Sequence, residues 1–170
     1  PHHRAVVELS ETMLVVPASS LDAPGTDPFT GPVYGATLFH GPRFQMIHEV
    51  SGLSKSVAGA RLVGTRAMEW KGFWNTDAAA LDGALQLALL WSAQMYGGRP
   101  LPTAITEIRF GSSGPVDNPL TCVLGHGEGR GARSVCDLSL RDSKGAVVFE
   151  LAGVELHRRP EAPSVPEMRA

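Results

Sequence analysis

The chain has 170 residues, of which 43% are hydrophobic and 19% are charged, so it has the length and composition of one globular domain with a substantial core. This composition excludes an intrinsically disordered chain. The 15 Lys and Arg residues against 17 Asp and Glu residues leave a formal net charge of −2, which argues against nucleic-acid binding because phosphate contacts require a basic surface. No apolar run approaches the roughly 18 residues that a membrane-spanning helix needs, so we expect no membrane partner.

The cysteines and the end of the chain bear on its cellular context. Cys122 and Cys136 form neither a disulfide framework nor a pattern of metal ligands, so we expect reduced thiols, no metal site and a cytoplasmic protein. Residues 158–170 are polar and rich in proline, as linkers are. We therefore expect one domain over residues 1–157 followed by a linker, as in a piece of a longer polypeptide.

The first third of the chain mixes strand-like segments with breaks. Prolines and glycines between residues 17 and 35 interrupt regular structure. The apolar segment 38–47 contains Gly41-Pro42, which predicts a turn and a short helix from Pro42, because proline suits the first helical position. Strands are expected here at residues 4–9, 13–16, 48–53 and 57–66.

The clearest predicted element is a helix over residues 77–95, which is rich in Ala and Leu, the strong helix formers. Asn75 or Thr76 can cap its start, and Gly97 with Gly98 can end it. Apolar residues occupy nearly every side of this helix, so we expect it to be buried on most sides.

Antiparallel strands are expected after the helix. Their predicted positions are residues 103–110, 119–125, 132–140 and 146–157. The glycine-rich run at 125–131 is typical of a hairpin turn, and it places His126 in a flexible loop. One buried helix followed by antiparallel strands defines an α+β fold. The three tryptophans are expected in the core; they are Trp70, Trp74 and Trp91.

Asp82 is the candidate for chemistry, because it lies in the second turn of a helix that is otherwise apolar. A buried carboxylate is costly unless it is paired. Burial favours its protonated form, whereas the positive end of the helix favours the ionised form. Gln86 follows four residues later on the same face, so it can orient Asp82 or bind a substrate oxygen. On spacing alone, an exposed carboxylate that only stabilises the helix dipole is the alternative interpretation.

Two segments carry a resemblance to a known family. LDGALQ at 81–86 resembles the Asp-x-x-x-Gln/His signature of polyketide synthase dehydratase domains, and FHGPRFQ at 39–45 resembles their Tyr-Gly-Pro-x-Phe-Gln segment. The second segment is also similar to dehydratase-like regions of polyunsaturated fatty acid synthases. The resemblance covers residues 33–157 and implies the C-terminal half of such a domain. It implies a hotdog fold, in which an antiparallel β-sheet wraps around the helix at 77–95.

The resemblance also implies a reaction, the removal of water from a 3-hydroxyacyl chain on an acyl carrier protein to give an enoyl thioester. In the family a histidine takes the C2 proton and the aspartate, here Asp82 with Gln86 beside it, protonates the leaving hydroxyl. No cofactor is implied, since the phosphopantetheine arm of the carrier protein holds the substrate. The residues implied in substrate binding are Phe39, Gly41, Pro42, Phe44 and Gln45.

The chain departs from the family pattern at the histidine. The family motif His-x-x-x-Gly-x-x-x-x-Pro belongs to the other, N-terminal hotdog, and the partial match that begins at His48 fails at Val57. His40 stands where the family commonly has tyrosine, and it is either an internal substitute for the missing catalytic base or a structural turn histidine. The residues before Asp82 read Asp-Ala-Ala-Ala-Leu, where His-Pro-Ala-Leu-Leu is usual.

Three functions therefore stay open. The first is a dehydratase domain of a multidomain polyketide or fatty-acid synthase that takes its histidine from another hotdog. The second is an inactive pseudo-dehydratase that binds acyl chains or acts as a structural or dimerisation module. The third is a hotdog thioesterase or a product-template-type cyclase. The partners expected are an acyl carrier protein, neighbouring synthase domains or a second hotdog, and a second copy in a homodimer.

Overall fold

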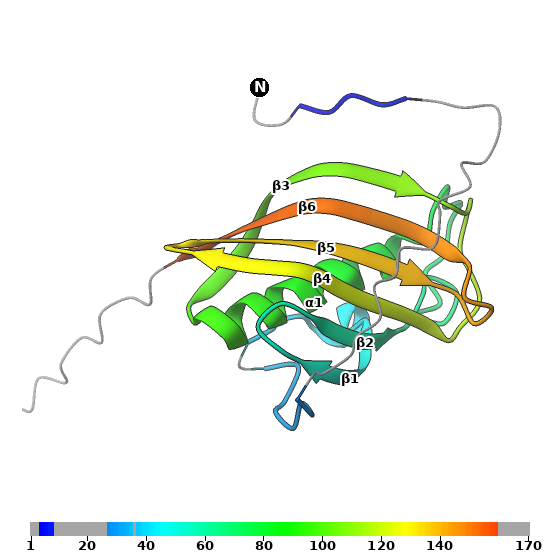
Figure 1. The fold of residues 1–170 in the computed structure, drawn as a ribbon. Coiled ribbons are helices and arrows are strands. Elements are labelled where there is room, and N and C mark those ends of the chain that lie inside the picture. The colour runs from blue at the N-terminus through cyan, green and yellow to red at the C-terminus, as the bar shows by residue number, and fades with distance from the viewer. Residues whose placement is uncertain (1–3, 9–26, 36, 160–170) are drawn as a thin grey trace, which may run out of the picture.

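The computed structural model describes residues 4–8, 27–35 and 37–159. Its strands form one antiparallel sheet in the order β1-β2-β4-β5-β6-β3, and α1 lies against one face of this curved sheet (Figure 1). The elements are η1 (Pro42–Phe44), β1 (Ile47–Leu53), β2 (Ala58–Leu62), α1 (Ala78–Tyr96), β3 (Arg99–Phe110), β4 (Leu120–Arg130), β5 (Arg133–Arg141) and β6 (Val147–Arg159). This arrangement confirms the predicted α+β class with a sheet around one buried helix.

Helix α1 begins and ends one residue later than predicted. The capping prediction is wrong: Asp77, not Asn75 or Thr76, is the N-cap, and its carboxylate accepts a hydrogen bond from the Ala80 N–H. Gly97 ends the helix with a φ of 73°, a left-handed conformation that glycine adopts without a steric penalty, and its N–H donates to the Ala93 carbonyl.

The helix lies in the centre of the hydrophobic core. Trp91 is fully buried, as predicted, and its indole N–H points at the carbonyls of Ser54 and Lys55, at 3.2 and 3.3 Å. Gly83 lets the helix approach the start of β1, because a Cβ there would lie 2.8 Å from the Met46 Cβ. This close approach brings the side chains of the second helical turn against the segment that enters β1.

The predicted seven-residue turn at 125–131 is wrong. β4 continues to Arg130 and turns over only Gly131 and Ala132, so the glycines before them belong to a strand. A Cβ on Gly127 would lie 2.4 Å from the ring of Trp91, and one on Gly129 would lie 2.6 Å from the ring of Tyr96. These glycines therefore serve close packing against α1 rather than a loop.

His126 lies at an irregularity of the β4–β5 pairing, not in a flexible turn. Its φ is 52°, and its Nδ1 lies 2.9 Å from Oδ2 of Asp137 on β5. The two cysteines are also placed by these strands: Cys122 is opposite Leu140 and Cys136 is opposite Val154, and both are free and buried. Burial raises the pKa of the Cys136 thiol to about 12.

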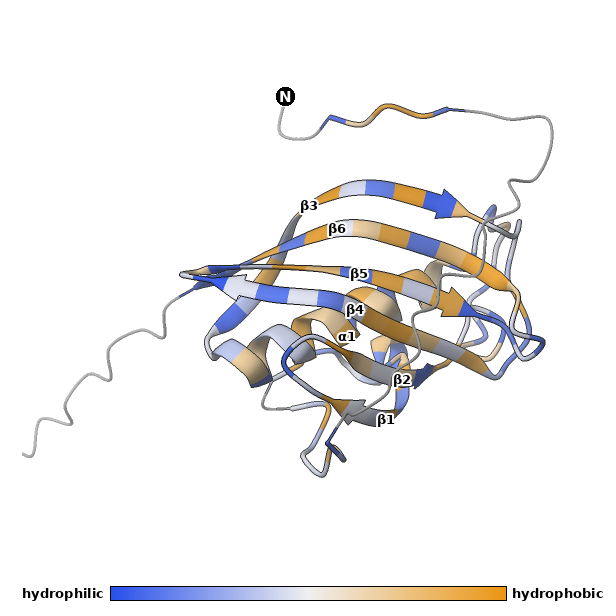
Figure 2. Cartoon of the chain, in the orientation of Figure 1, coloured by the Kyte–Doolittle hydropathy of each residue, from blue (hydrophilic) through white to orange (hydrophobic). Residues whose placement is uncertain are grey.

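β3 forms one edge of the sheet and pairs with β6 (Figure 1). Hydrophilic and hydrophobic residues alternate along it (Figure 2), yet nearly all its residues are exposed on both faces. The exposed residues include Leu101, Ile108 and Phe110, which are 38–44% exposed. Among the described strands, β3 is thus the one that offers a long edge with apolar side chains beside it.

Several predicted boundaries differ from the observed ones or lie outside the described residues. Residues 4–8 belong to no strand, so the strand predicted at 4–9 is wrong over that part, and the one predicted at 13–16 lies outside the described residues. β6 runs to Arg159, two residues past the expected domain end, and residues 160–170 of the expected linker lie outside the described residues. Within the described part of the chain, no helix has the length and hydropathy needed to cross a membrane.

Candidate functional site

Asp82 and Gln86 come together as the sequence predicts. Both project from the same side of α1, and Gln86 Nε2 donates a hydrogen bond to Asp82 Oδ2 at 2.7 Å. Gln86 is fully buried, whereas the Asp82 carboxyl is only half-buried. Asp82 therefore combines a fixed position with access to solvent or to a bound molecule.

Gln86 uses every hydrogen-bonding position of its side-chain amide. Its second N–H donates to the Phe44 carbonyl at 2.8 Å. Its oxygen accepts from the Tyr34 hydroxyl at 2.7 Å and, over a longer 3.4 Å, from the Met46 N–H. A buried amide that is saturated in this way cannot rotate without losing several bonds. Gln86 thus orients Asp82 and has no donor or acceptor left for a substrate.

Tyr34 completes this network, and sequence reasoning missed it. Its hydroxyl accepts from the Ile47 N–H at 2.7 Å and donates to Gln86. Burial raises the pKa of the Tyr34 phenol to about 12, and the nearby Asp82 adds to the rise. Fifty-two residues separate Tyr34 from Gln86, so no local pattern connects them.

His40 lies at the edge of the site rather than at its centre. Its ring stacks on Phe39, with centroids 5.1 Å apart, and meets the Tyr34 ring edge-on at 6.5 Å. Its Nδ1 is buried and has no hydrogen-bond partner among the described residues. No hydrogen bond or ion pair within the same residues joins a histidine to Asp82. Within the described residues, His40 is therefore in ring contact with Tyr34 and forms no hydrogen bond with the Asp82 carboxyl.

The segment 39–45 forms the wall beside this network. Gly41 precedes η1, and the Phe44 N–H donates to the Gly41 carbonyl at 2.8 Å. Gln45 Nε2 donates to the His40 carbonyl at 3.1 Å, which fixes the turn. The Phe44 backbone binds Gln86, while its ring is 52% exposed; the Phe39 ring is more exposed still. This wall presents the rings of Phe39 and Phe44 outward and binds, through its backbone, the glutamine that holds Asp82.

A row of aromatic rings, Phe44, Trp70 and Trp74, extends from that wall. The centroids of Phe44 and Trp70 are 5.4 Å apart and those of Trp70 and Trp74 are 5.8 Å apart. Trp70 and Trp74 are only half-buried, so the core prediction holds for Trp91 and not for them. The rings of the row are thus available at the surface.

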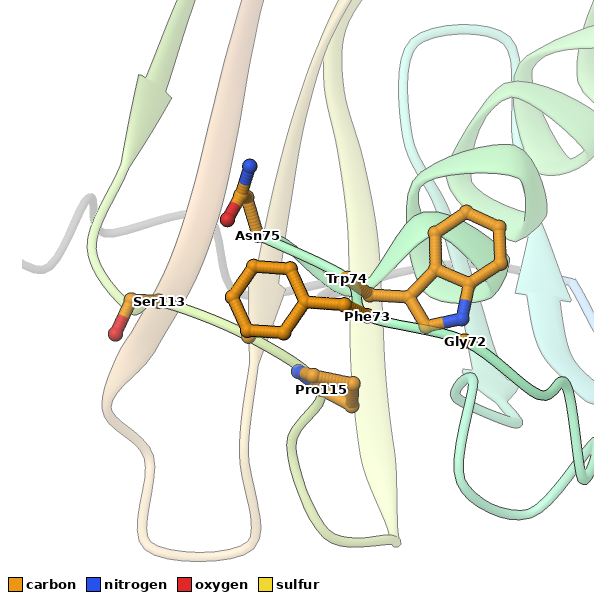
Figure 3. Close-up of a pocket in the computed structure, with 7 residues that line it drawn as sticks. Gly72, Phe73, Trp74, Asn75, Ser113 and Pro115 are labelled. Atoms are coloured by element: carbon orange, nitrogen blue, oxygen red, sulfur yellow. The ribbon is translucent and has the colours of Figure 1, made fainter.

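The aromatic row ends at an open pocket of ≈ 380 Å³, between the loop before α1 and the loop after β3. Figure 3 shows the ring of Phe73 at this pocket, between Asn75 and Pro115. The ring of Phe73 is 91% exposed, and the Gly114 N–H joins the two loops by donating to the Asn75 carbonyl at 2.9 Å. The aromatic row therefore runs from Phe44, whose carbonyl binds Gln86, to this pocket.

Asp77, five residues before Asp82 on the same helix, has a different environment. It is fully buried, and its Oδ1 accepts from the N–H and the hydroxyl of Thr65, both at 2.8 Å, as well as from Ala80. Its Oδ2 accepts from the Val116 N–H at 3.0 Å. With four donors bound, this carboxyl holds the start of α1 to two loops and is closed to a ligand.

Comparisons with known proteins identify the family. The family model described as polyketide synthase dehydratase N-terminal domain matches residues 17–164. The chain is 37% identical over 134 residues to a polyunsaturated fatty acid synthase subunit of Thraustochytrium sp. (strain ATCC 26185 / S-3), and this match covers 73% of the chain but 5% of that protein. The chain thus belongs to the polyketide synthase dehydratase family and spans a small part of this relative.

Solved structures show the same fold. The dehydratase domain from the CurJ module of curacin polyketide synthase gives a TM-score of 0.58 at 18% identity, over 72% of this chain and 44% of that one. The dehydratase-cyclase domain in ambruticin biosynthesis gives 0.55 at 22% identity, over 70% and 41%. The hotdog fold is confirmed, and the chain spans less than half of these structures. Since the family model is described as N-terminal and the LDGALQ motif points to the C-terminal half, the choice of half stays a prediction.

Proposed function

We propose that this domain provides the acid of a 3-hydroxyacyl dehydratase and that Asp82 is that acid. The observation that carries the proposal is the half-buried carboxyl of Asp82, held through Oδ2 by the buried Gln86. No described residue forms a hydrogen bond to its Oδ1. A general acid needs this combination of a fixed position and a free oxygen that faces the leaving group.

The proposed reaction eliminates water from a 3-hydroxyacyl thioester. A base removes a proton from C2, and the electrons of that C–H bond form the C2=C3 double bond. The C3–O bond breaks at the same time, and Asp82 Oδ1 gives its proton to the departing hydroxyl, so that water leaves. Asp82 ends as a carboxylate and the base ends protonated; exchange with solvent restores both.

We infer that the base is a histidine of a second hotdog, from a neighbouring synthase domain or from a second copy in a homodimer. Within the described residues no hydrogen bond or ion pair joins His40 to Asp82, which supports an external source. The open edge of β3, with Leu101, Ile108 and Phe110 exposed, offers backbone N–H and C=O groups for a strand of another hotdog. His40 itself is the internal alternative.

The substrate is proposed to be an acyl chain on the phosphopantetheine arm of an acyl carrier protein, so the domain needs no cofactor of its own. The wall beside Asp82 supports this, and its proposed substrate-binding residues are Phe39, Gly41, Pro42, Phe44 and Gln45. The aromatic row gives the chain an apolar surface, and each buried CH₂ group contributes about 0.8 kcal/mol. Two reduced, buried thiols suit the cytoplasm, where such synthases would find their carrier protein.

The test is a dehydration assay on a 3-hydroxyacyl carrier protein, followed by mass spectrometry of the product. It is run with the chain alone and with an added dehydratase-family domain that keeps its histidine but has lost its aspartate. We expect loss of water from the acyl chain, and a fall of roughly 100-fold or more in Asp82→Asn, the usual effect of removing a general acid. Asp117→Asn, an exposed aspartate paired with Arg66, is the matched control. Release of a free acid would instead indicate a thioesterase.

An acyl-binding domain without turnover is the second candidate, and the absence of a histidine at Asp82 within the described residues favours it. This candidate requires that the acyl carrier protein binds and that no arm of the assay eliminates water. Tryptophan fluorescence can follow the binding, because Trp70 and Trp74 belong to the aromatic row.

A further inference from the structure

Tyr34 takes no part in the proposed reaction, yet it is linked to the central carboxyl through one side chain. We propose that Tyr34 is a positioning residue: it fixes the side-chain amide of Gln86, and this amide directs the acidic proton of Asp82 to Oδ1. The inference rests on the proposed dehydratase function and adds a residue to it that the sequence motifs do not contain.

The direction of the Tyr34 hydrogen bond follows from its partners. A tyrosine hydroxyl carries one proton, and the Ile47 N–H already donates to its oxygen at 2.7 Å. The hydroxyl proton is therefore free to point at Gln86 Oε1, 2.7 Å away. Because burial raises the pKa of Tyr34 to about 12, the phenol keeps this proton throughout the neutral range.

This donor and the Phe44 carbonyl together determine which way the Gln86 amide faces. If the amide turned by half a rotation, its NH₂ group would face the Met46 N–H, its oxygen would face the Phe44 carbonyl, and Gln86 would lose the bond that it accepts from Tyr34. The Met46 contact is 3.4 Å, beyond the usual range for an N–H donor, whereas the Tyr34 contact is 2.7 Å. The Phe44 carbonyl, which can only accept, favours the same orientation through its 2.8 Å bond from Nε2, so Tyr34 and Phe44 set the orientation together from opposite ends of the amide.

The amide orientation then decides where Asp82 carries its proton. Oδ2 already accepts from Gln86 Nε2 at 2.7 Å, so a proton on Oδ2 would meet an N–H. The proton must therefore reside on Oδ1, the oxygen proposed to face the substrate. With the amide reversed, Gln86 Oε1 would accept a proton from Oδ2 and keep it away from the leaving hydroxyl.

The backbone holds Tyr34 in place for this role. Tyr34 forms a bridge with Leu38, whose side chain is 2% exposed, and the neighbouring Gly35 N–H donates to the Leu38 carbonyl at 2.8 Å. Gly35 has a φ of 101°, which lets the chain turn tightly after Tyr34. The hydroxyl is thus presented by a turn tied to the core.

The first arm of the test needs no turnover. Proton–nitrogen NMR follows the side-chain amide of Gln86, whose signals are identified by their loss in Gln86→Leu. In Tyr34→Phe we expect these signals to shift and to exchange with water faster, while circular dichroism stays unchanged. Tyr96→Phe is the control, since that hydroxyl contacts the Lys55 carbonyl near the other end of α1. Gln86 signals that do not respond to Tyr34→Phe would overturn the inference, whatever the activity.

The second arm is a double-mutant cycle on turnover. We expect Tyr34→Phe to lower kcat roughly tenfold and to leave KM within about twofold, because the substrate still binds but meets a misdirected acid. In the Gln86→Leu background the same substitution should cost nothing further. Losses that multiply would show that Tyr34 does not act through Gln86 and would overturn the proposal. A wild-type chain without turnover in the presence of the added histidine-bearing domain would count against the dehydratase function, and the NMR arm would still decide the positioning role.

Discussion

Helix α1 carries two aspartates within its first turns, and their surroundings differ in nearly every respect. Asp77 is fully buried and accepts four hydrogen bonds, three of them from residues outside the helix. Asp82 is half-buried and accepts one, from Gln86. A carboxyl whose two oxygens both accept hydrogen bonds from the protein is not available to a ligand, whereas a carboxyl held through one oxygen can react through the other. Burial of an acid therefore does not by itself mark a reactive site in this fold.

The hydrogen-bond partners of the two carboxyls explain why Asp77 has a structural role and Asp82 a reactive one. Asp77 accepts hydrogen bonds from Thr65 and Val116, which belong to two loops that pass the start of α1. Asp77 therefore joins these two loops to the helix. Asp82 depends on Gln86, which is itself saturated by Tyr34 and Phe44. The rigidity of Asp82 thus comes from its neighbour, and its own second oxygen stays available. This contrast leads to predictions about stability and activity that separate the two sites.

The largest expected effect is on stability, in Asp77→Ala. The substitution removes the helix cap and leaves the buried N–H groups of Thr65 and Val116 without an acceptor, so we expect the free energy of unfolding to fall by about 3–5 kcal/mol. Asp82→Ala loses one hydrogen bond at a half-buried position and leaves one N–H of Gln86 unpaired, so it should cost about 1–2 kcal/mol. Urea unfolding followed by circular dichroism measures both.

The same pair of variants tests the comparison from the activity side. Asp82→Ala should lose dehydration at a temperature where it is fully folded, while any Asp77→Ala protein that remains folded should retain it. Equal losses of stability in the two variants would contradict the division into a structural and a reactive aspartate.

A smaller effect is expected from Gly83→Ala. The new Cβ would lie 2.8 Å from the Met46 Cβ and 3.1 Å from a Leu62 methyl, and such overpacking costs about 1–3 kcal/mol. The higher helix propensity of alanine returns up to about 1 kcal/mol, so we expect a net loss of about 1–2 kcal/mol in the free energy of unfolding. Activity should fall as well, because pushing α1 from the segment before β1 disturbs the bond from Gln86 to the Phe44 carbonyl.

The exposed α1 position Gln94 gives the matched control for Gly83. Gln94→Ala changes helix propensity without new contacts and should leave both quantities nearly unchanged. If Gly83→Ala behaved like this control, the close approach of α1 to β1 would not matter for Asp82.

Features that depend on neighbouring residues in the sequence could be predicted, whereas features that depend on residues distant in the sequence could not. The helix at 77–95 was predicted within one residue at each end, because helix propensity is local. The proximity of Asp82 and Gln86 also follows from local geometry, since residues four apart share a helix face. Family resemblance added the hotdog fold, which composition alone could not supply.

The failures have tertiary causes. The glycines before Gly131 suggested a turn, but Gly127 and Gly129 are required by the rings of Trp91 and Tyr96, which come from another element. Asp77 became the cap instead of Asn75 or Thr76 because Thr65 and Val116 bring further donors to its carboxyl. Tyr34 was missed for the same reason: what makes it important lies 52 residues away in the sequence.

The last variant is Thr65→Val, which keeps the shape of the side chain but removes its hydroxyl. Asp77 then loses one of four donors, and the Ala79 N–H loses its acceptor, the Thr65 hydroxyl at 3.1 Å. Since three donors to Asp77 remain, we expect a loss of about 1–2 kcal/mol in the free energy of unfolding, well below that of Asp77→Ala. The kinetic constants should not change, because the Asp82 network does not include Thr65. A fall in kcat at unchanged stability would instead mean that the two carboxyls are coupled through the first turns of α1, and the distinction between them would fail.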